Sequence, residues 1–162
     1  MSDKHQVQTR LVRLLEQKGW HIATAESLTG GLMSRCITDV SGASRVFECG
    51  VCSYSDRIKQ QVLGVSPLTL AQWGAISAQT AREMAAGVQR LSGAQIALST
   101  TGNAGPDASE NKPVGLVYLG LAGPGGCQSR KLQLTGDRES IRTQAAQLAL
   151  EFALEVLEAD EN

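Results

Sequence analysis

The sequence has little of what several specialised protein classes need. Aromatic residues make up only 4% of its 162 residues, and 15 basic against 16 acidic residues leave a net charge of −1. General nucleic-acid binders need a basic surface, and single-strand binders stack bases on aromatic side chains. No apolar run approaches the length that spans a bilayer. We therefore expect neither a nucleic-acid partner nor a membrane partner.

Cysteine and histidine are also scarce. The four cysteines form no disulfide-framework pattern, and they are Cys36, Cys49, Cys52 and Cys127. Cys49 and Cys52 have C-x-x-C spacing, but they fall in a predicted strand, where residues three apart point to opposite faces. Buried small side chains are favoured there over a metal or redox site. Residues 1–6 are polar and do not resemble a secretory signal, so we expect a cytoplasmic protein with reduced thiols.

What the sequence does contain is an alternation of helical and strand patterns. Apolar residues, 42% of the chain, support one domain over residues 1–162. Their spacing predicts helices over 7–18, 30–40, 56–63, a short stretch from 66, 77–91 and a last helix from 137, with strands over 21–25, 48–54, 94–101, 114–121 and 127–134. Gly123 to Gly126 would join the last two strands as an antiparallel hairpin. This order predicts a single-domain α/β fold, a three-layer α/β/α sandwich with a mixed sheet.

Four hydroxyl-rich segments lie at the predicted strand ends or helix starts. They cover residues 25–31, 41–44, 53–55 together with Lys59, and 100–106. The carboxyl ends of the strands form the ligand crevice of an open α/β sheet. These segments are therefore the candidate functional residues.

The two glycine-rich turns each have two interpretations. Thr29-Gly30-Gly31 follows a strand and opens a helix, which suits an anion, although glycine there also serves close packing of a helix on a sheet. Thr101-Gly102-Asn103 begins a turn through which backbone can approach a ligand, or an ordinary surface loop. Arg138 and Arg142 share a helix face, either as an anion clamp or as surface charge.

Ser44, Tyr54 and Lys59 form the candidate chemical group. A serine hydroxyl needs a base to become nucleophilic, and a desolvated lysine can be that base because burial lowers its pKa. A tyrosine hydroxyl can relay a proton. Ser27 is the competing nucleophile, since it ends a strand beside a helix start. The alternative is that these three side chains occur near one another in the sequence by chance and form no catalytic group.

Taken in order, many short motifs resemble the C-terminal domain of the competence/damage-inducible protein CinA. The resemblance covers about residues 5–157, and its motifs are Ala25-Glu26-Ser27-Leu28-Thr29-Gly30-Gly31, Ser41-Gly42-Ala43-Ser44, Phe47-Glu48-x-Gly50, Tyr54-Ser55, Lys59, Gly74-Ala75-Ile76-Ser77, Thr101-Gly102-x-Ala104-Gly105-Pro106, Lys112-Pro113-Val114-Gly115 and Gly136-Asp137-Arg138. Stand-alone, PncC-like versions of this domain are nicotinamide mononucleotide (NMN) deamidases.

The resemblance implies hydrolysis of the NMN carboxamide to nicotinate mononucleotide and ammonia, a step of pyridine nucleotide recycling without metal or cofactor. On this resemblance Ser44 matches the proposed nucleophile, and Tyr54 and Lys59 match its activating partners. The substrate pocket that it implies contains Ser27, Thr29, Gly30, Gly31, Thr101, Gly102, Asn103 and Arg142.

The sequence departs from the family pattern at two positions. Leu28 stands where the family usually has cysteine and is expected to be harmless. Asn103 stands where isoleucine is usual and is expected to affect substrate choice. The larger domain of long CinA proteins is not in this sequence, so its pyrophosphatase-type activity is not expected.

A rival hypothesis from another class is a non-catalytic nucleotide-binding or regulatory module, which would keep the phosphate turns without an activated serine. A homo-oligomer, most simply a dimer, is expected from the alanine-rich helices and the two tryptophans.

Overall fold

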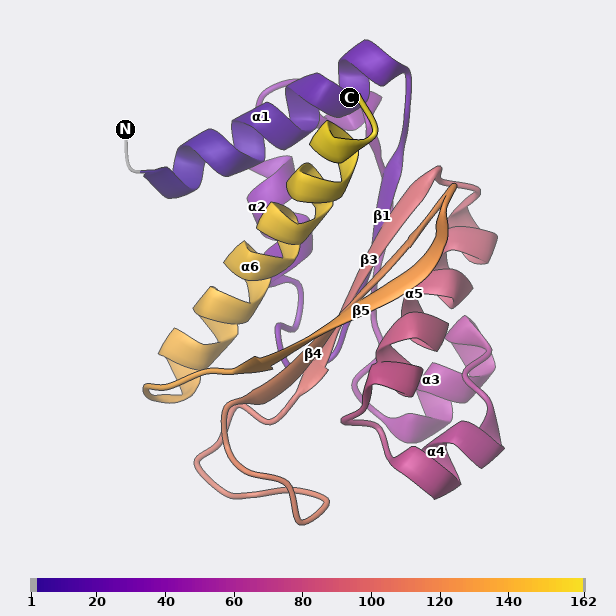
Figure 1. The fold of residues 1–162 in the computed structure, drawn as a ribbon, viewed down its shortest axis with the longest axis vertical. Coiled ribbons are helices and arrows are strands. Elements are labelled where there is room, and N and C mark those ends of the chain that lie inside the picture. The colour runs from indigo at the N-terminus through magenta and orange to yellow at the C-terminus, as the bar shows by residue number, and fades with distance from the viewer. Residues whose placement is uncertain (1–2, 162) are drawn as a thin grey trace.

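The computed structural model describes residues 3–161, which form a five-stranded sheet between two layers of helices (Figure 1). Helices α1, α2 and α6 cover one face, and α3, α4 and α5 cover the other. The elements in chain order are α1 (Asp3–Lys18), β1 (Ile22–Glu26), α2 (Leu32–Thr38), a 3₁₀ turn (Ala43–Arg45), β2 (Phe47–Cys52), α3 (Asp56–Leu63), α4 (Pro67–Trp73), α5 (Ala78–Ser92), β3 (Ile96–Gly102), β4 (Leu116–Gly123), β5 (Gly126–Gln133) and α6 (Arg138–Ala159). The predicted three-layer architecture is confirmed.

The sheet is mixed, as predicted, with strand order β2-β1-β3-β4-β5. The first three strands are parallel, and β4 and β5 pair antiparallel. In the register of the parallel strands, Glu26 of β1 lies opposite Cys52 of β2 and Thr100 of β3. The chain leaves β1 toward β2 on one side and later reaches β3 on the other. A crevice therefore forms where three carboxyl ends meet.

Local sequence explains most helix boundaries. Ser77 and Asp137 cap α5 and α6, since their side chains accept the backbone N–H groups of Thr80 and Ser140 at 3.1 and 2.8 Å. Asp56 begins the predicted helix over 56–63 and is a residue type that often caps helices, but it is not the cap of α3. Ser55 caps α3 by accepting the N–H of Ile58 at 3.2 Å, and Asp56 is the first helical residue.

Two local features differ from the prediction. Helix α2 begins at Leu32 rather than at residue 30, because Gly30 and Gly31 adopt left-handed backbone angles with φ of 55° and 107°. The turn Ala43–Arg45 forms a short 3₁₀ helix that no periodicity indicated. Cys49 and Cys52 lie in β2 as expected, and all four cysteines are free.

The larger core packs α1, α2 and α6 on one face of the sheet, and a smaller core packs α5 on the other. Strand β3 is buried along six of its seven residues, which is typical of a strand covered on both faces. Within residues 3–161, no helix is long and apolar enough to cross a membrane. Localisation and the homo-oligomer remain predictions.

Close packing of α5 on α3 is testable at Gly87, where an added Cβ would overlap the backbone carbonyl of Leu63. Gly87→Ala should lower the free energy of unfolding by about 1–3 kcal/mol through overpacking. The sign is informative, because alanine is intrinsically better in a helix by roughly 1 kcal/mol. Urea denaturation measures the effect. Gly125→Ala, where a Cβ meets nothing within 4 Å, is the control and should be neutral; stabilisation by Gly87→Ala would contradict the packing argument.

Candidate active site

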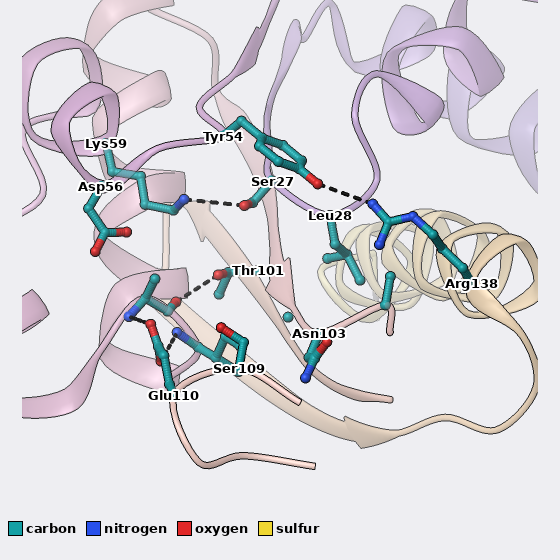
Figure 2. A pocket seen from close by; sticks show the side chains of 14 residues that line it. Ser27, Leu28, Tyr54, Asp56, Lys59, Thr101, Asn103, Ser109, Glu110 and Arg138 are labelled. Carbon is teal, nitrogen blue, oxygen red and sulfur yellow. Dashed lines mark hydrogen bonds between the residues drawn. The ribbon is translucent and has the colours of Figure 1, made fainter. Parts of the chain in front are cut away.

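A pocket of about 470 Å³ opens at the carboxyl ends of β1, β2 and β3 (Figure 2). Backbone hydrogen bonds hold the strand ends together there. The N–H of Ser27 donates to Thr100 O at 3.1 Å, and the N–H of Ser53 donates to Glu26 O at 2.8 Å. The polar side chains on its lining are those of Ser27, Tyr54, Asp56, Lys59, Thr101, Asn103, Ser109, Glu110 and Arg138.

Lys59 and Ser27 form a close pair in this pocket. Lys59 projects from α3 and is only 1% exposed. Its Nζ lies 2.8 Å from Ser53 O and 3.2 Å from Ser27 Oγ. Burial lowers the pKa of Lys59, and attraction to Asp56 and Glu110 opposes this shift. The pair therefore places a serine hydroxyl beside a lysine whose pKa is lowered by burial.

Tyr54 and Arg138 form the opposite rim. Arg138 Nη2 donates to the Tyr54 hydroxyl at 3.2 Å, and Nη1 donates to Gly105 O at 2.6 Å. Tyr54 is exposed. Because its oxygen accepts from Arg138, its own hydrogen remains available to a ligand. Arg138 supplies a cation that faces the pocket.

The loop after β3 forms one wall. Thr101 lines the pocket, and its hydroxyl donates to Ala75 O at 2.6 Å. Gly102 lines it too, and an added Cβ would lie 2.7 Å from Leu116 O. The Oδ1 atom of Asn103 accepts the N–H of Gly105 at 3.0 Å. The polar side chain of Asn103 therefore braces the loop as well as facing the pocket.

Glu110 and Lys112 clamp this loop to the turn between α4 and α5. The Glu110 carboxylate accepts the N–H groups of Ala75 and Ile76 at 2.8 and 3.1 Å. Lys112 Nζ donates to the carbonyls of Trp73 and Ile76 and to Glu110 at 3.1 Å. These backbone bonds and Lys112 lower the pKa of Glu110, against the effect of its burial.

The turn at Thr29-Gly30-Gly31, where the sequence predicts an anion site, lies outside the pocket. None of its three residues lines the pocket. The start of α2 already holds an anion, the buried Glu26 carboxylate, which accepts the N–H groups of Met33 and Ser34 at 2.8 and 3.1 Å. An internal carboxylate thus occupies the place that the sequence suggested for a ligand anion.

Arg142 also lies outside the pocket lining. Its Nε donates to Leu28 O at 2.8 Å, and its Nη2 donates to Thr29 O at 3.3 Å. Its donors therefore hold the turn after β1 in place. Of the two arginines on this helix face, Arg138 is the one that faces the pocket.

Ser44 does not join Tyr54 and Lys59, which corrects the predicted group within one chain. It is exposed in the 3₁₀ turn before β2 and borders a separate hollow with Thr38 and Phe47. Tyr54 follows the other end of β2, and six strand residues span about 20 Å. Ser27 stands where Ser44 was expected.

Sequence reasoning missed Asp56 and Glu110 as pocket residues. Asp56 lies at a predicted helix start, where its residue type indicates a cap, and Glu110 lies in a segment whose composition indicates turns but no particular contact. Arg138 was recognised beside Arg142, but helical spacing could not decide between them.

Comparison with known proteins identifies the family to which this chain belongs. Residues 4–157 match the family model described as the CinA C-terminal domain. Nicotinamide-nucleotide amidohydrolase PncC from Enterobacter agglomerans is 46% identical over 158 residues, which cover 95% of this chain and 96% of that protein. A CinA-like protein from Kosmotoga olearia is 49% identical over 148 residues, covering 91% of this chain. That alignment covers only 36% of the Kosmotoga protein, so the chain spans little more than a third of this longer curated relative.

Solved structures agree with the fold. A CinA superfamily protein from Klebsiella pneumoniae has a TM-score of 0.94 at 33% identity, over 98% of this chain and 99% of that one. A competence/damage inducible protein from Agrobacterium tumefaciens has a TM-score of 0.92 at 35% identity, over 98% and 97% of the two chains.

The buried Glu26 carboxylate yields a stability prediction. Glu26→Gln should lower the free energy of unfolding by at least about 2 kcal/mol, because an amide loses charge-assisted bonds and its NH₂ faces backbone donors. Urea denaturation at neutral pH is the measurement. Glu48→Gln, an exposed matched change, should cost less than about 1 kcal/mol. Equal effects of the two substitutions would refute the role of Glu26.

Proposed function

Because the chain belongs to the CinA C-terminal domain family, and because its pocket holds a serine beside a buried lysine, we propose that it hydrolyses the carboxamide of NMN. The products are nicotinate mononucleotide and ammonia, and the reaction belongs to pyridine nucleotide recycling. The full-length PncC relative supports the substrate class by its name. The single observation that carries the reaction type is the 3.2 Å approach of Lys59 Nζ to Ser27 Oγ.

Acylation starts from neutral Lys59. Ser27 Oγ attacks the carboxamide carbon while its proton passes to Lys59 Nζ, forming a C–O bond and a tetrahedral oxyanion. The Tyr54 hydroxyl, whose hydrogen is free, is a donor for the oxygen or nitrogen of the amide. Protonated Lys59 returns the proton to the amide nitrogen as the C–N bond breaks. Ammonia leaves, and an ester with Ser27 remains.

Deacylation repeats these steps with water as the nucleophile and Ser27 as the leaving group. Water attacks the ester carbon, and neutral Lys59 takes its proton. The C–O bond to Ser27 then breaks, the serine oxygen recovers a proton and nicotinate mononucleotide is released. Lys59 thus acts as base and acid in turn, which requires a pKa below that of an exposed lysine. Burial moves the pKa of Lys59 in this direction.

The pocket also fits the rest of the substrate. Its volume of about 470 Å³ lies within the roughly 300–1,000 Å³ usual for small-molecule sites. Arg138 lies across the pocket from Lys59 (Figure 2) and offers a guanidinium to a phosphate. We assign the phosphate to Arg138 in place of Arg142 and the turn at residues 29–31.

The nucleophile is tested by two alanine variants. Ser27→Ala should lower kcat for NMN by at least about a thousandfold, because the covalent route is removed. Ser44→Ala, the matched control, should keep the wild-type rate, since Ser44 lies at the other end of β2. Ammonia release measures both, with circular dichroism to confirm folding. An active Ser27→Ala beside an inactive Ser44→Ala would exclude this mechanism. A folded wild-type protein that binds NMN without releasing ammonia would favour the non-catalytic module.

The phosphate assignment is tested at the two arginines. Arg138→Ala should raise KM for NMN roughly tenfold or more, as expected for one charge-assisted phosphate contact. The ratio of kcat/KM for NMN to that for its dephosphorylated riboside should fall accordingly. Arg142→Ala should instead lower the free energy of unfolding and leave that ratio unchanged. The assignment fails if only Arg142→Ala changes the ratio.

A further inference from the structure

The two carboxylates of the pocket lie opposite Arg138. Asp56, Lys59 and Glu110 lie on one side, Arg138 lies on the opposite side, and Ser27 lies between them (Figure 2). A substrate that reacts at Ser27 therefore meets two different electrostatic surroundings at its two ends.

The three ionisable groups on the Lys59 side contribute differently to its net charge. Glu110 is paired with Lys112 and saturated by two backbone donors. Lys59 acts in its neutral form in the proposed reaction. Within residues 3–161, the Asp56 carboxylate has no hydrogen bond and no ion pair, and its attraction to Lys59 is its one described interaction. With Lys59 neutral, this side therefore carries one uncompensated negative charge, that of Asp56.

We propose that Asp56 makes the pocket selective for an amide whose ring carries a positive charge. This inference rests on the proposed function and specifies which substrates the site accepts. The base of NMN is such a group, because the ribosylated ring nitrogen is cationic while the carboxamide is neutral. A dihydropyridine amide with the same ribose and phosphate lacks the ring charge and loses this attraction.

The same charge distinguishes substrate from product. Hydrolysis replaces the neutral amide by a carboxylate, so the net charge of the base moiety falls from positive to zero. The new anion forms beside Ser27, between Asp56 and Arg138, and the net positive charge that Asp56 attracts is lost. Asp56 therefore favours binding of the amide over binding of the acid, and product leaves more readily.

A purely structural role for Asp56 makes a different prediction. Asp56 is the first residue of α3, where an acidic side chain stabilises a helix N-terminus. If that were its whole contribution, its replacement would lower stability and affect all ligands alike. Charge selection instead changes the ratios between ligands of different ring charge.

The test uses Ser27→Ala protein, which leaves NMN intact, with and without Asp56→Asn. Calorimetry compares NMN, its reduced dihydropyridine form and nicotinate mononucleotide. Asp56→Asn should weaken NMN binding roughly fivefold, as expected for two charges several ångströms apart near a solvated surface. The reduced form should change less than about twofold, and the effect on NMN should shrink as salt rises. The preference for NMN over nicotinate mononucleotide should also fall.

Asp160→Asn is the matched control, since Asp160 is exposed at the C-terminal end of α6, outside the pocket lining. It should change none of the three affinities. Equal weakening of all three ligands by Asp56→Asn, or no change in NMN binding, would overturn the charge-selection proposal while wild-type ammonia release still supported the proposed function. Absence of ammonia release by the wild type, with these ratios intact, would reject the hydrolysis and keep the selection.

Discussion

One buried carboxylate organises the functional end of this protein. Glu26 is fully buried, and no cation neutralises it among the residues that the structure describes. A charge in such a place is tolerated only if donors surround it. The backbone N–H groups of Met33 and Ser34 and the hydroxyls of Ser34 and Thr29 provide them. Thr29 then bonds Thr100 of β3 at 2.7 Å. The need to solvate one anion thus fixes β1, α2 and β3 relative to one another, and with them the backbone of Ser27.

The two-residue repeat of a strand explains why this anion does not neutralise Lys59. Successive residues point to opposite faces. Glu26 bonds to α2 on one face, and the next residue, Ser27, meets Lys59 of α3 on the other. A salt bridge between Glu26 and Lys59 would hold the lysine protonated. Since Lys59 instead reaches a serine and a backbone carbonyl, its pKa is free to respond to burial. The acid that orders the turn, Glu26, and the serine that contacts the lysine, Ser27, are therefore adjacent in sequence but bond to opposite sides of the sheet.

Periodicity and caps predicted the elements of the fold because helices and strands obey short-range rules. Ser77 and Asp137 are typical N-cap residues and lie at the starts of α5 and α6. The turn at Gly123 to Gly126 indicates the antiparallel pair β4 and β5. The site could be predicted only in part, because short-range rules do not fix contacts between distant segments. Topology brings strand ends together, and for that reason Tyr54, Lys59, Thr101 and Ser27 line one pocket. Ser44 failed because its turn precedes β2 instead of following it. The place of Glu110 in the pocket could not be predicted, because it depends on a contact between its loop and residues 75 and 76. Local sequence does not encode such contacts.

The mixed sheet also determines what forms the last wall of the pocket. After a parallel strand a helix would normally cross back, but β4 returns antiparallel beside β3. The connection is therefore a loop, residues 103–115, and it must be held by side chains because no helix holds it. Asn103 ties its start to Gly105, and Glu110 with Lys112 ties its far part to the turn before α5. Because Lys112 pairs with Glu110, the negative charge of Glu110 adds little to the net charge of the pocket. The antiparallel return of β4 thereby leaves Asp56 as the carboxylate that a bound ligand meets.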